Sequence, residues 1–145
     1  MRIAGNWHSC DDGVVRPMLV IDATSATGVT VEDRFLVDLG ADRTVFSAAL
    51  LAKLGGGTAA APSGISLEGI GGTQAFVQVQ ATINLRRSDG GMATIQGNFA
   101  AFTDPGATDF SILGRDVLDH FDVILSRRRD ELFLLAPPSR YEIHP

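Results

Sequence analysis

The sequence places one aspartate where a carboxyl group could take part in acid–base chemistry. An apolar run at 35–37 (Phe-Leu-Val) leads directly into Asp38, and Gly40 follows two residues later. A carboxylate can accept a proton from an attacking water molecule, and a carboxylic acid can donate one to the group under attack. Two carboxyl groups held close together share one proton, because two adjacent negative charges repel each other. Asp38 is therefore the first candidate for acid–base chemistry.

Two glycine-containing segments follow further along the chain. Residues 69–72 (Gly-Ile-Gly-Gly) lie between two strand-like segments, and residues 112–116 (Ile-Leu-Gly-Arg-Asp) begin the last predicted helix. Each feature also has a simple structural interpretation. Asp38 can be an ordinary residue at the end of a strand, Asp42 can be a solvated turn residue, and 69–72 can be a plain hairpin turn.

Asp104 is a second aspartate to consider, in the segment 104–107 (Asp-Pro-Gly-Ala). Pro105 fixes its own φ and has no N–H to donate. No long apolar run leads directly into Asp104. We therefore predict a β-turn here rather than a second reactive loop.

The pattern along the chain predicts a mostly β domain with one or two short helices, because short apolar runs alternate with turn signals throughout. The clearest strand is 77–86, where apolar and polar residues alternate strictly, so that one face is buried and the other is wet. Further strands are expected at 14–23, 29–37, 92–102, 122–125 and 131–135, and helices at 47–54 and 115–120. Pro17 indicates an edge or a bulge in the first of these strands.

Composition supports one globular domain, 1–145, with a core at about 14–135. The chain has 145 residues, of which 45% are hydrophobic and 20% are charged. Its 12 basic and 17 acidic residues give a formal charge of −5. Nucleic acid is not expected as a partner, because neutralising phosphates requires clustered Arg and Lys. The basic run 127–129 is short and is closed by two acidic residues, so we interpret it as a solvated turn.

The cysteine and histidine content predicts no metal site. Cys10 is the single cysteine, so neither an intrachain disulfide nor a Cys-rich metal site can form. The three histidines are far apart in the sequence. The first residues lack the apolar segment of a signal peptide, and no stretch approaches the roughly 18 apolar residues of a membrane span. We therefore expect no membrane partner and a cytoplasmic location.

Taken in order, the three segments resemble the retropepsin-like aspartic protease family. Segment 36–44 (Leu-Val-Asp-Leu-Gly-Ala-Asp-Arg-Thr) resembles the family's Asp-Thr-Gly-Ala loop. Segment 69–72 resembles the glycine-rich flap, and 112–116 resembles the motif of two hydrophobic residues followed by Gly-Arg-Asp or Gly-Arg-Asn. Order and spacing match from about 14 to 135. The chain is thus similar to a single-domain, bacterial-type member, which implies a closed β-barrel that forms half of a pepsin-like architecture.

The resemblance implies an aspartic endopeptidase with Asp38 as the catalytic residue, acting on a peptide or protein without a metal or organic cofactor. Because one chain supplies only one such loop, a second copy must supply the other aspartate, which implies a homodimer with a two-fold axis. The residues expected to contact substrate are Gly40, Ala41, Asp42, Gly69, Ile70, Gly71 and Gly72. The residues expected to hold the site together are Leu39, Thr44, Gly114 and Arg115, with Arg115 paired to Asp42.

Leu39 departs from the family pattern, which has Thr or Ser after the aspartate. In the family this hydroxyl bonds to the backbone of the opposite loop, and a leucine cannot make that bond. Its absence costs roughly 1–3 kcal/mol if a buried backbone group is left unpaired. Two interpretations stay open: a protease with activity weakened at Leu39, and an inactive module of the same fold that binds peptides or supports assembly.

Overall fold

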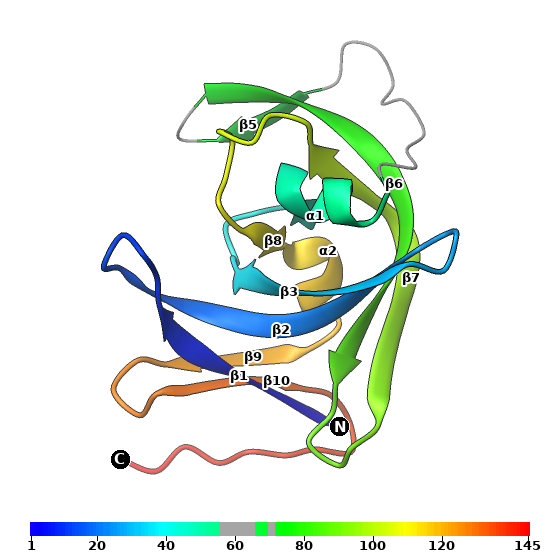
Figure 1. The fold of residues 1–145 in the computed structure, drawn as a ribbon. Helices are drawn as coiled ribbons and strands as arrows, with labels where there is room; N and C mark the ends of the chain where they lie inside the picture. Colours follow the sequence, from blue (N-terminus) through cyan, green and yellow to red (C-terminus); the bar gives the residue numbers. More distant parts are fainter. Residues whose placement is uncertain (56–65, 70–71) are drawn as a thin grey trace.

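The structure is a computed structural model that describes residues 1–55, 66–69 and 72–145. Strands dominate it, and the two helices are short (Figure 1). Along the chain the elements are β1 (Arg2–Ser9), β2 (Val15–Ser25), β3 (Thr30–Val37), β4 (Val45–Phe46), α1 (Ala48–Lys53), β5 (Ser66–Gly69), β6 (Gly72–Arg86), β7 (Met92–Phe102), β8 (Ser111–Leu113), α2 (Arg115–Leu118), β9 (Asp122–Ser126) and β10 (Glu131–Leu135).

Six of the described strands close into a barrel. Their order around the ring is β6, β7, β4, β8, β3 and β2, and the pairing of β2 with β6 closes it. Most pairs are antiparallel, but β3 pairs with β8 and β4 with β7 in parallel. The parallel pairing of β3 with β8 matters for the site, because both strands then end on the same side of the barrel.

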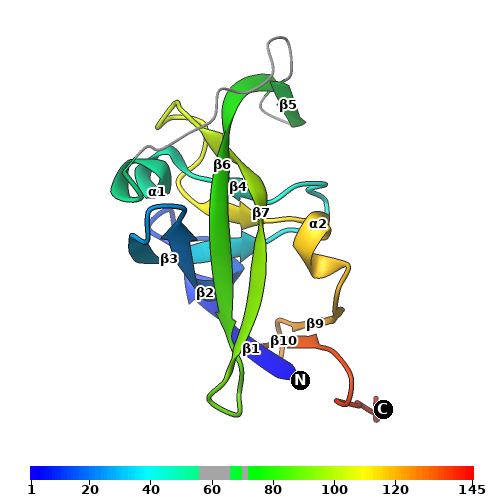
Figure 2. The same ribbon diagram turned by 90° about the vertical axis from the view of Figure 1, so that its right-hand side faces the viewer.

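The remaining described strands extend the sheet at two places. The first half of β1 pairs with β10 and its second half with β2, so β1 joins the barrel to the hairpin of β9 and β10. At the other end, β5 pairs only with β6, and this hairpin projects above the barrel in both Figure 1 and Figure 2.

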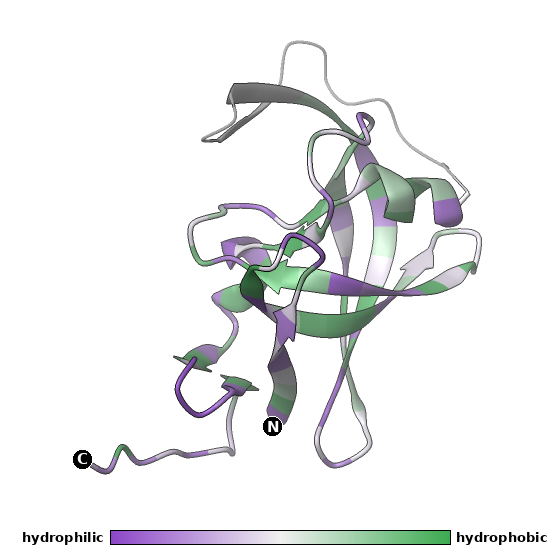
Figure 3. Ribbon diagram, turned by 60° about the vertical axis from the view of Figure 1, so that its left-hand side comes forward, coloured by the Kyte–Doolittle hydropathy of each residue, from purple (hydrophilic) through white to green (hydrophobic). Residues whose placement is uncertain are grey.

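Aromatic side chains fill the centre of the barrel. The ring of Phe46 packs edge-on against Phe35, with 5.7 Å between ring centroids, and stacks on Phe99 at 5.3 Å. All three are buried. Burial of each large apolar side chain stabilises the folded state by roughly 1.5–3 kcal/mol relative to leaving that side chain exposed. Hydrophobic residues accordingly concentrate in the central strands, while the turn of the last hairpin is hydrophilic (Figure 3).

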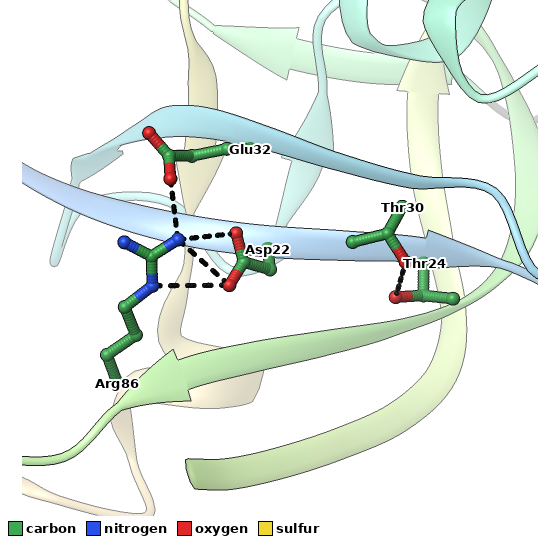
Figure 4. Close-up of polar contacts among 5 residues, drawn as sticks. All are labelled: Asp22, Thr24, Thr30, Glu32 and Arg86. Carbon is green, nitrogen blue, oxygen red and sulfur yellow. Dashed lines mark hydrogen bonds and ion pairs between the residues drawn. The ribbon is translucent and has the colours of Figure 1, made fainter. Parts of the chain in front are cut away.

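A charged cluster crosses the outer face where the barrel closes. Arg86 on β6 donates to both carboxylate oxygens of Asp22 on β2, at 2.8 and 3.2 Å, and to Glu32 on β3 at 2.5 Å (Figure 4). These bonds raise the pKa of Arg86, chiefly through the bond to Asp22. One guanidinium group therefore spans the three adjacent strands at the closure.

The predicted class, a mostly β barrel with two short helices, is confirmed. The expected strands appear as β2, β3, β6, β7, β9 and β10, and Ser47 caps α1 by accepting a hydrogen bond from the Leu50 amide. The second helix ends at Leu118, earlier than expected. Pro17 lies where β2 pairs only with β1, so it does sit at an edge. The sequence pattern does not predict β1, β4 or β8, whereas β5 corresponds to the strand-like segment before residues 69–72.

Candidate active site

Asp38 follows the last residue of β3, where the chain leaves the barrel. Its amide donates to the carbonyl of Leu113, the last residue of β8, at 3.1 Å. Its Oδ1 accepts a hydrogen bond from the Gly40 amide at 2.9 Å, and its carbonyl accepts one from the Ala41 amide at 3.2 Å. The side chain is half-buried. Hydrogen bonds therefore hold Asp38 both through its backbone and through its carboxylate.

The loop 38–44 lies against the segment that starts α2. The Arg115 amide donates to the Ala41 carbonyl at 2.8 Å, and the Asp116 amide donates to the Asp42 carbonyl at 3.2 Å. These contacts join residues more than 70 positions apart in the sequence. Figure 2 shows the loop and α2 together on one side of the barrel.

The hydroxyl of Thr44 is the centre of a second set of bonds. It donates to Asp116 Oδ1 at 2.7 Å and accepts from the Gly114 amide at 3.1 Å, while the Thr44 amide donates to the same carboxylate oxygen at 2.9 Å. Thr44 is fully buried. Both ends of the loop are thus fixed to the same short segment, one through Leu113 and the other through Thr44.

Gly114 is placed where no side chain fits. A Cβ atom at this position would lie 2.3 Å from the carbonyl carbon of Arg43. The expected role of this glycine in holding the site together agrees with this geometry.

Asp42 and Arg115 form the ion pair expected from the sequence. The contact raises the pKa of Arg115, mainly through the hydrogen bond to Asp42. Both side chains are at least half exposed, so the pair is screened by solvent and adds little to stability.

Leu39 stands out because it is a large apolar side chain that is 49% exposed at the tip of a tightly bonded loop. The amides of Gly40 and Ala41 are engaged within the loop. Of the predicted flap residues, Gly69 pairs with Gly72 at the end of the β5–β6 hairpin. Ile70 and Gly71 lie outside the described residues.

A cavity of about 600 Å³ lies elsewhere, between the β1–β2 turn, residues of β2 and β3 that include Asp33, and the segment before β8. No described residue of the 38–44 loop lines it. Its wall is held by Arg16, which donates to both oxygens of Asp12, at 2.9 and 2.7 Å, and lies 5.1 Å above the ring of Phe110. Bonds from Arg16 and from the Val14 amide lower the pKa of Asp12 to about 2.

Within the described residues, neither helix is long and apolar enough to cross a membrane. Over the same residues, no three His, Cys, Asp or Glu side chains are grouped so that they could hold a metal ion. Cys10 is a buried free thiol.

The barrel, with a loop leaving β3 and clamped by the segment after β8, defines a retropepsin-like fold. The structure is similar to that of a retropepsin-like aspartic protease from Rickettsia conorii, with a TM-score of 0.51, 19% identity, and coverage of 92% of this chain and 88% of that one. No protein-family model matches the sequence, and a search of curated proteins found no match.

Two further structures are similar at lower TM-scores. The protease of EIAV in complex with the inhibitor HBY-793 has a TM-score of 0.49 and 21% identity, over 72% of this chain and 86% of that one. The retroviral protease-like domain of Ddi1 from Leishmania major has a TM-score of 0.47 and 14% identity, over 85% and 98%.

Some residues that build this site were not singled out from the sequence. In the sequence Asp116 is only the end of a motif, yet its carboxylate accepts both bonds from Thr44. The Leu113 carbonyl and the Arg43 backbone carry no sequence signal at all, because their role depends on where two distant segments meet. Asp116 could have been found, since an acidic residue in the first turn of a helix is well placed to bond nearby amides.

Proposed function

We propose that this protein is an aspartic endopeptidase that works as a homodimer, with one Asp38 from each copy forming the catalytic pair. The observation that carries the proposal is the position of Asp38, fixed by Leu113 and Gly40 at the mouth of a retropepsin-like barrel. In the pair, one carboxylate takes a proton from water as the water attacks the peptide carbonyl, and the other, protonated, donates to the carbonyl oxygen.

The substrate would be an extended peptide, bound as an added strand through its main chain. Because the Gly40 and Ala41 amides are occupied within the loop, the Gly40 carbonyl is the group we assign to the peptide backbone. Asp42 would meet the peptide beside its contact with Arg115. The flap residues Gly69 to Gly72 would cover the peptide from above.

The direct test is cleavage of a peptide library at acid pH by wild type and by two matched variants. Asp38→Asn removes the carboxylate but keeps its shape, so cleavage should fall at least about a thousandfold. Asp104→Asn is the control. Asp104 is an exposed β-turn residue whose Oδ1 accepts from the Gly106 amide, and an Asn oxygen preserves that bond. Cleavage that persists in Asp38→Asn would overturn the proposal, and a chelator-sensitive activity would point to a metal.

The dimer has its own test. Sedimentation at tens of micromolar should give a two-copy species, and pepstatin should bind it at one inhibitor per dimer. A strict monomer that still cleaves peptides through Asp38 would refute the shared pair.

A second candidate is a peptide-binding module of the same fold without catalysis. It is favoured by one observation, an exposed leucine at the position where the family carries a hydroxyl. A peptide that binds the wild-type dimer and stays intact through prolonged incubation at pH 3–7 would support this function instead.

A further inference from the structure

A carboxylate occupies a position on β3 that the strand pattern assigns to the core. Side chains alternate between the two faces of a strand, and Phe35 and Val37 are buried on the inner face. Asp33 shares that face and lies opposite the fully buried Ile21 in the pairing with β2. It is only partly exposed. A charged group in such a position is costly unless it is hydrogen-bonded.

Asp33 is bonded to a hydroxyl inside the barrel wall. Its Oδ2 accepts from Ser111 Oγ at 3.1 Å, and its Oδ1 accepts from the Arg34 amide at 2.9 Å. Ser111 is fully buried, and its oxygen in turn accepts from the Ser47 amide at 3.0 Å. The result is a chain from β3 through the first residue of β8 to the residue that caps α1.

These three residues lie on the segments that lead into, out of and alongside the candidate catalytic loop. Asp33 precedes Asp38 by five residues on the same strand. Ser111 is the first residue of the three-residue strand β8. The carbonyl of its last residue, Leu113, accepts a hydrogen bond from the Asp38 amide. Ser47 follows Thr44 by three residues. The chain of hydrogen bonds therefore ties together the backbone on both sides of the loop and the strand that supports it.

We infer that Asp33 is a positioning residue of the candidate site, which acts by holding Ser111 and hence the register of β8 against β3. Ser111 has one O–H to donate, and Asp33 accepts it. This leaves the oxygen lone pairs of Ser111 free for the Ser47 amide. Without Asp33, the buried Ser111 O–H keeps only the Ser47 Oγ atom, 3.5 Å away, as an acceptor. Leu113 is then held less firmly under Asp38.

The first test measures backbone order and does not depend on activity. Native-state hydrogen exchange is followed at the amides of Asp38, Thr44 and Gly114. Each of these amides donates a hydrogen bond that joins the 38–44 loop to the segment 113–116. Asp33→Leu and Ser111→Ala should speed exchange at these amides about tenfold, the effect of losing one buried hydrogen bond. Amides in the central part of the β6–β7 pairing should change less than about twofold.

Two further variants serve as rescue and control. Asp33→Asn keeps an oxygen that can accept from Ser111, so it should restore exchange to within about twofold of wild type. Glu32→Leu removes the neighbouring carboxylate, which points to the outer face and bonds Arg86 (Figure 4), so it should leave the three amides unchanged. The double variant Asp33→Leu with Ser111→Ala should be no faster than Ser111→Ala alone, because Ser111→Ala already removes the bond between Asp33 and Ser111.

Kinetics give the second readout, and this part rests on the proposed function. Asp33→Leu should lower kcat about tenfold with KM within about twofold of wild type, because misplacement of Asp38 affects the reacting geometry more than substrate binding. Asp33→Asn should recover kcat. If Asp38→Asn shows that no cleavage depends on Asp38, the proposed function fails, but the exchange result still decides the role of Asp33.

Three results would overturn the inference. One is unchanged exchange at the loop amides in Asp33→Leu and Ser111→Ala. Another is equal acceleration across the whole chain, which means general destabilisation. The third is failure of Asp33→Asn to restore the wild-type pattern. If Asp33→Leu does not fold, the same amides are compared in Ser111→Ala, which removes only one oxygen atom.

Discussion

Gly114 and Arg43 meet backbone to backbone where the candidate catalytic loop packs against the segment before α2. A Cβ at position 114 would lie 2.4 Å from the Arg43 carbonyl oxygen and 2.9 Å from its nitrogen. Backbone cannot move aside as a flexible side chain can. The loop that carries Asp38 therefore keeps its place only if position 114 remains a glycine.

Gly114→Ala should lower the free energy of unfolding by about 2–3 kcal/mol, as overpacking of a close contact does. Urea unfolding followed by fluorescence measures the change. Gly97→Ala is the matched control on β7, where a new Cβ would make an ordinary contact at 3.8 Å from the Phe99 ring. It should be neutral or stabilising by up to about 1 kcal/mol. Equal effects of the two substitutions would contradict the close-contact argument.

Thr44→Val keeps the shape of the side chain but removes its hydroxyl. The buried Gly114 amide then loses its acceptor, and Asp116 loses one donor. We expect a loss of about 1–3 kcal/mol in the free energy of unfolding. Thr24→Val removes a hydroxyl that bonds Thr30 on the outer face (Figure 4) and should cost less than about 0.5 kcal/mol. If the Thr44→Val protein is as stable as Thr24→Val, the attachment of the loop to the segment 113–116 does not depend on the Thr44 hydroxyl.

Arg16 should control the titration of Asp12. With Arg16 present, the pKa of Asp12 is about 2, and Arg16→Leu should return it toward its ordinary value of 3.8. Because the pKa is lower in the folded state, the stabilising contribution is present above about pH 4 and is lost as pH falls toward 2. NMR titration of the Asp12 carboxyl carbon measures the shift directly. The stability gap between wild type and Arg16→Leu should also narrow from pH 5 to pH 2, and a constant gap would argue against the linkage.

The sequence supports the barrel and the main parts of the site because both depend on local patterns. Strict alternation at 77–86 predicts a strand, and it forms most of β6. Asp38, Thr44 and Gly114 stand in motifs whose order along the chain is informative, and the structure places all three in or against one loop.

The rest could not be predicted from the sequence, because it depends on contacts between distant segments. Strand β1 has a mixed, weakly patterned sequence and becomes a strand by pairing with β10 and β2. Asp33 breaks the alternation of β3, but only the position of Ser111, 78 residues away, gives that break a reason. The acceptor of the Asp38 amide is a backbone carbonyl, which any residue type at 113 would supply.

Leu39 is half exposed and directly follows Asp38 in the loop. In the proposed dimer, the two copies of Leu39 face each other where hydroxyl groups would bond across the interface. An apolar contact stabilises the dimer but is less directional than a hydrogen bond, so the two carboxyl groups are less firmly held. Catalysis depends steeply on such positioning. Wild-type cleavage should therefore be slow, and Leu39→Thr should raise kcat without changing the fold.

Leu39→Val separates the hydroxyl from the change in size, because valine has the shape of threonine without its oxygen. We expect Leu39→Thr to cleave faster than Leu39→Val, with sedimentation showing the same dimer for both. If Leu39→Thr leaves a silent protein silent while the dimer persists, the missing hydroxyl is not the cause, and the peptide-binding function gains support. If wild type already cleaves efficiently and Leu39→Thr slows it, the apolar contact itself holds the Asp38 pair in place.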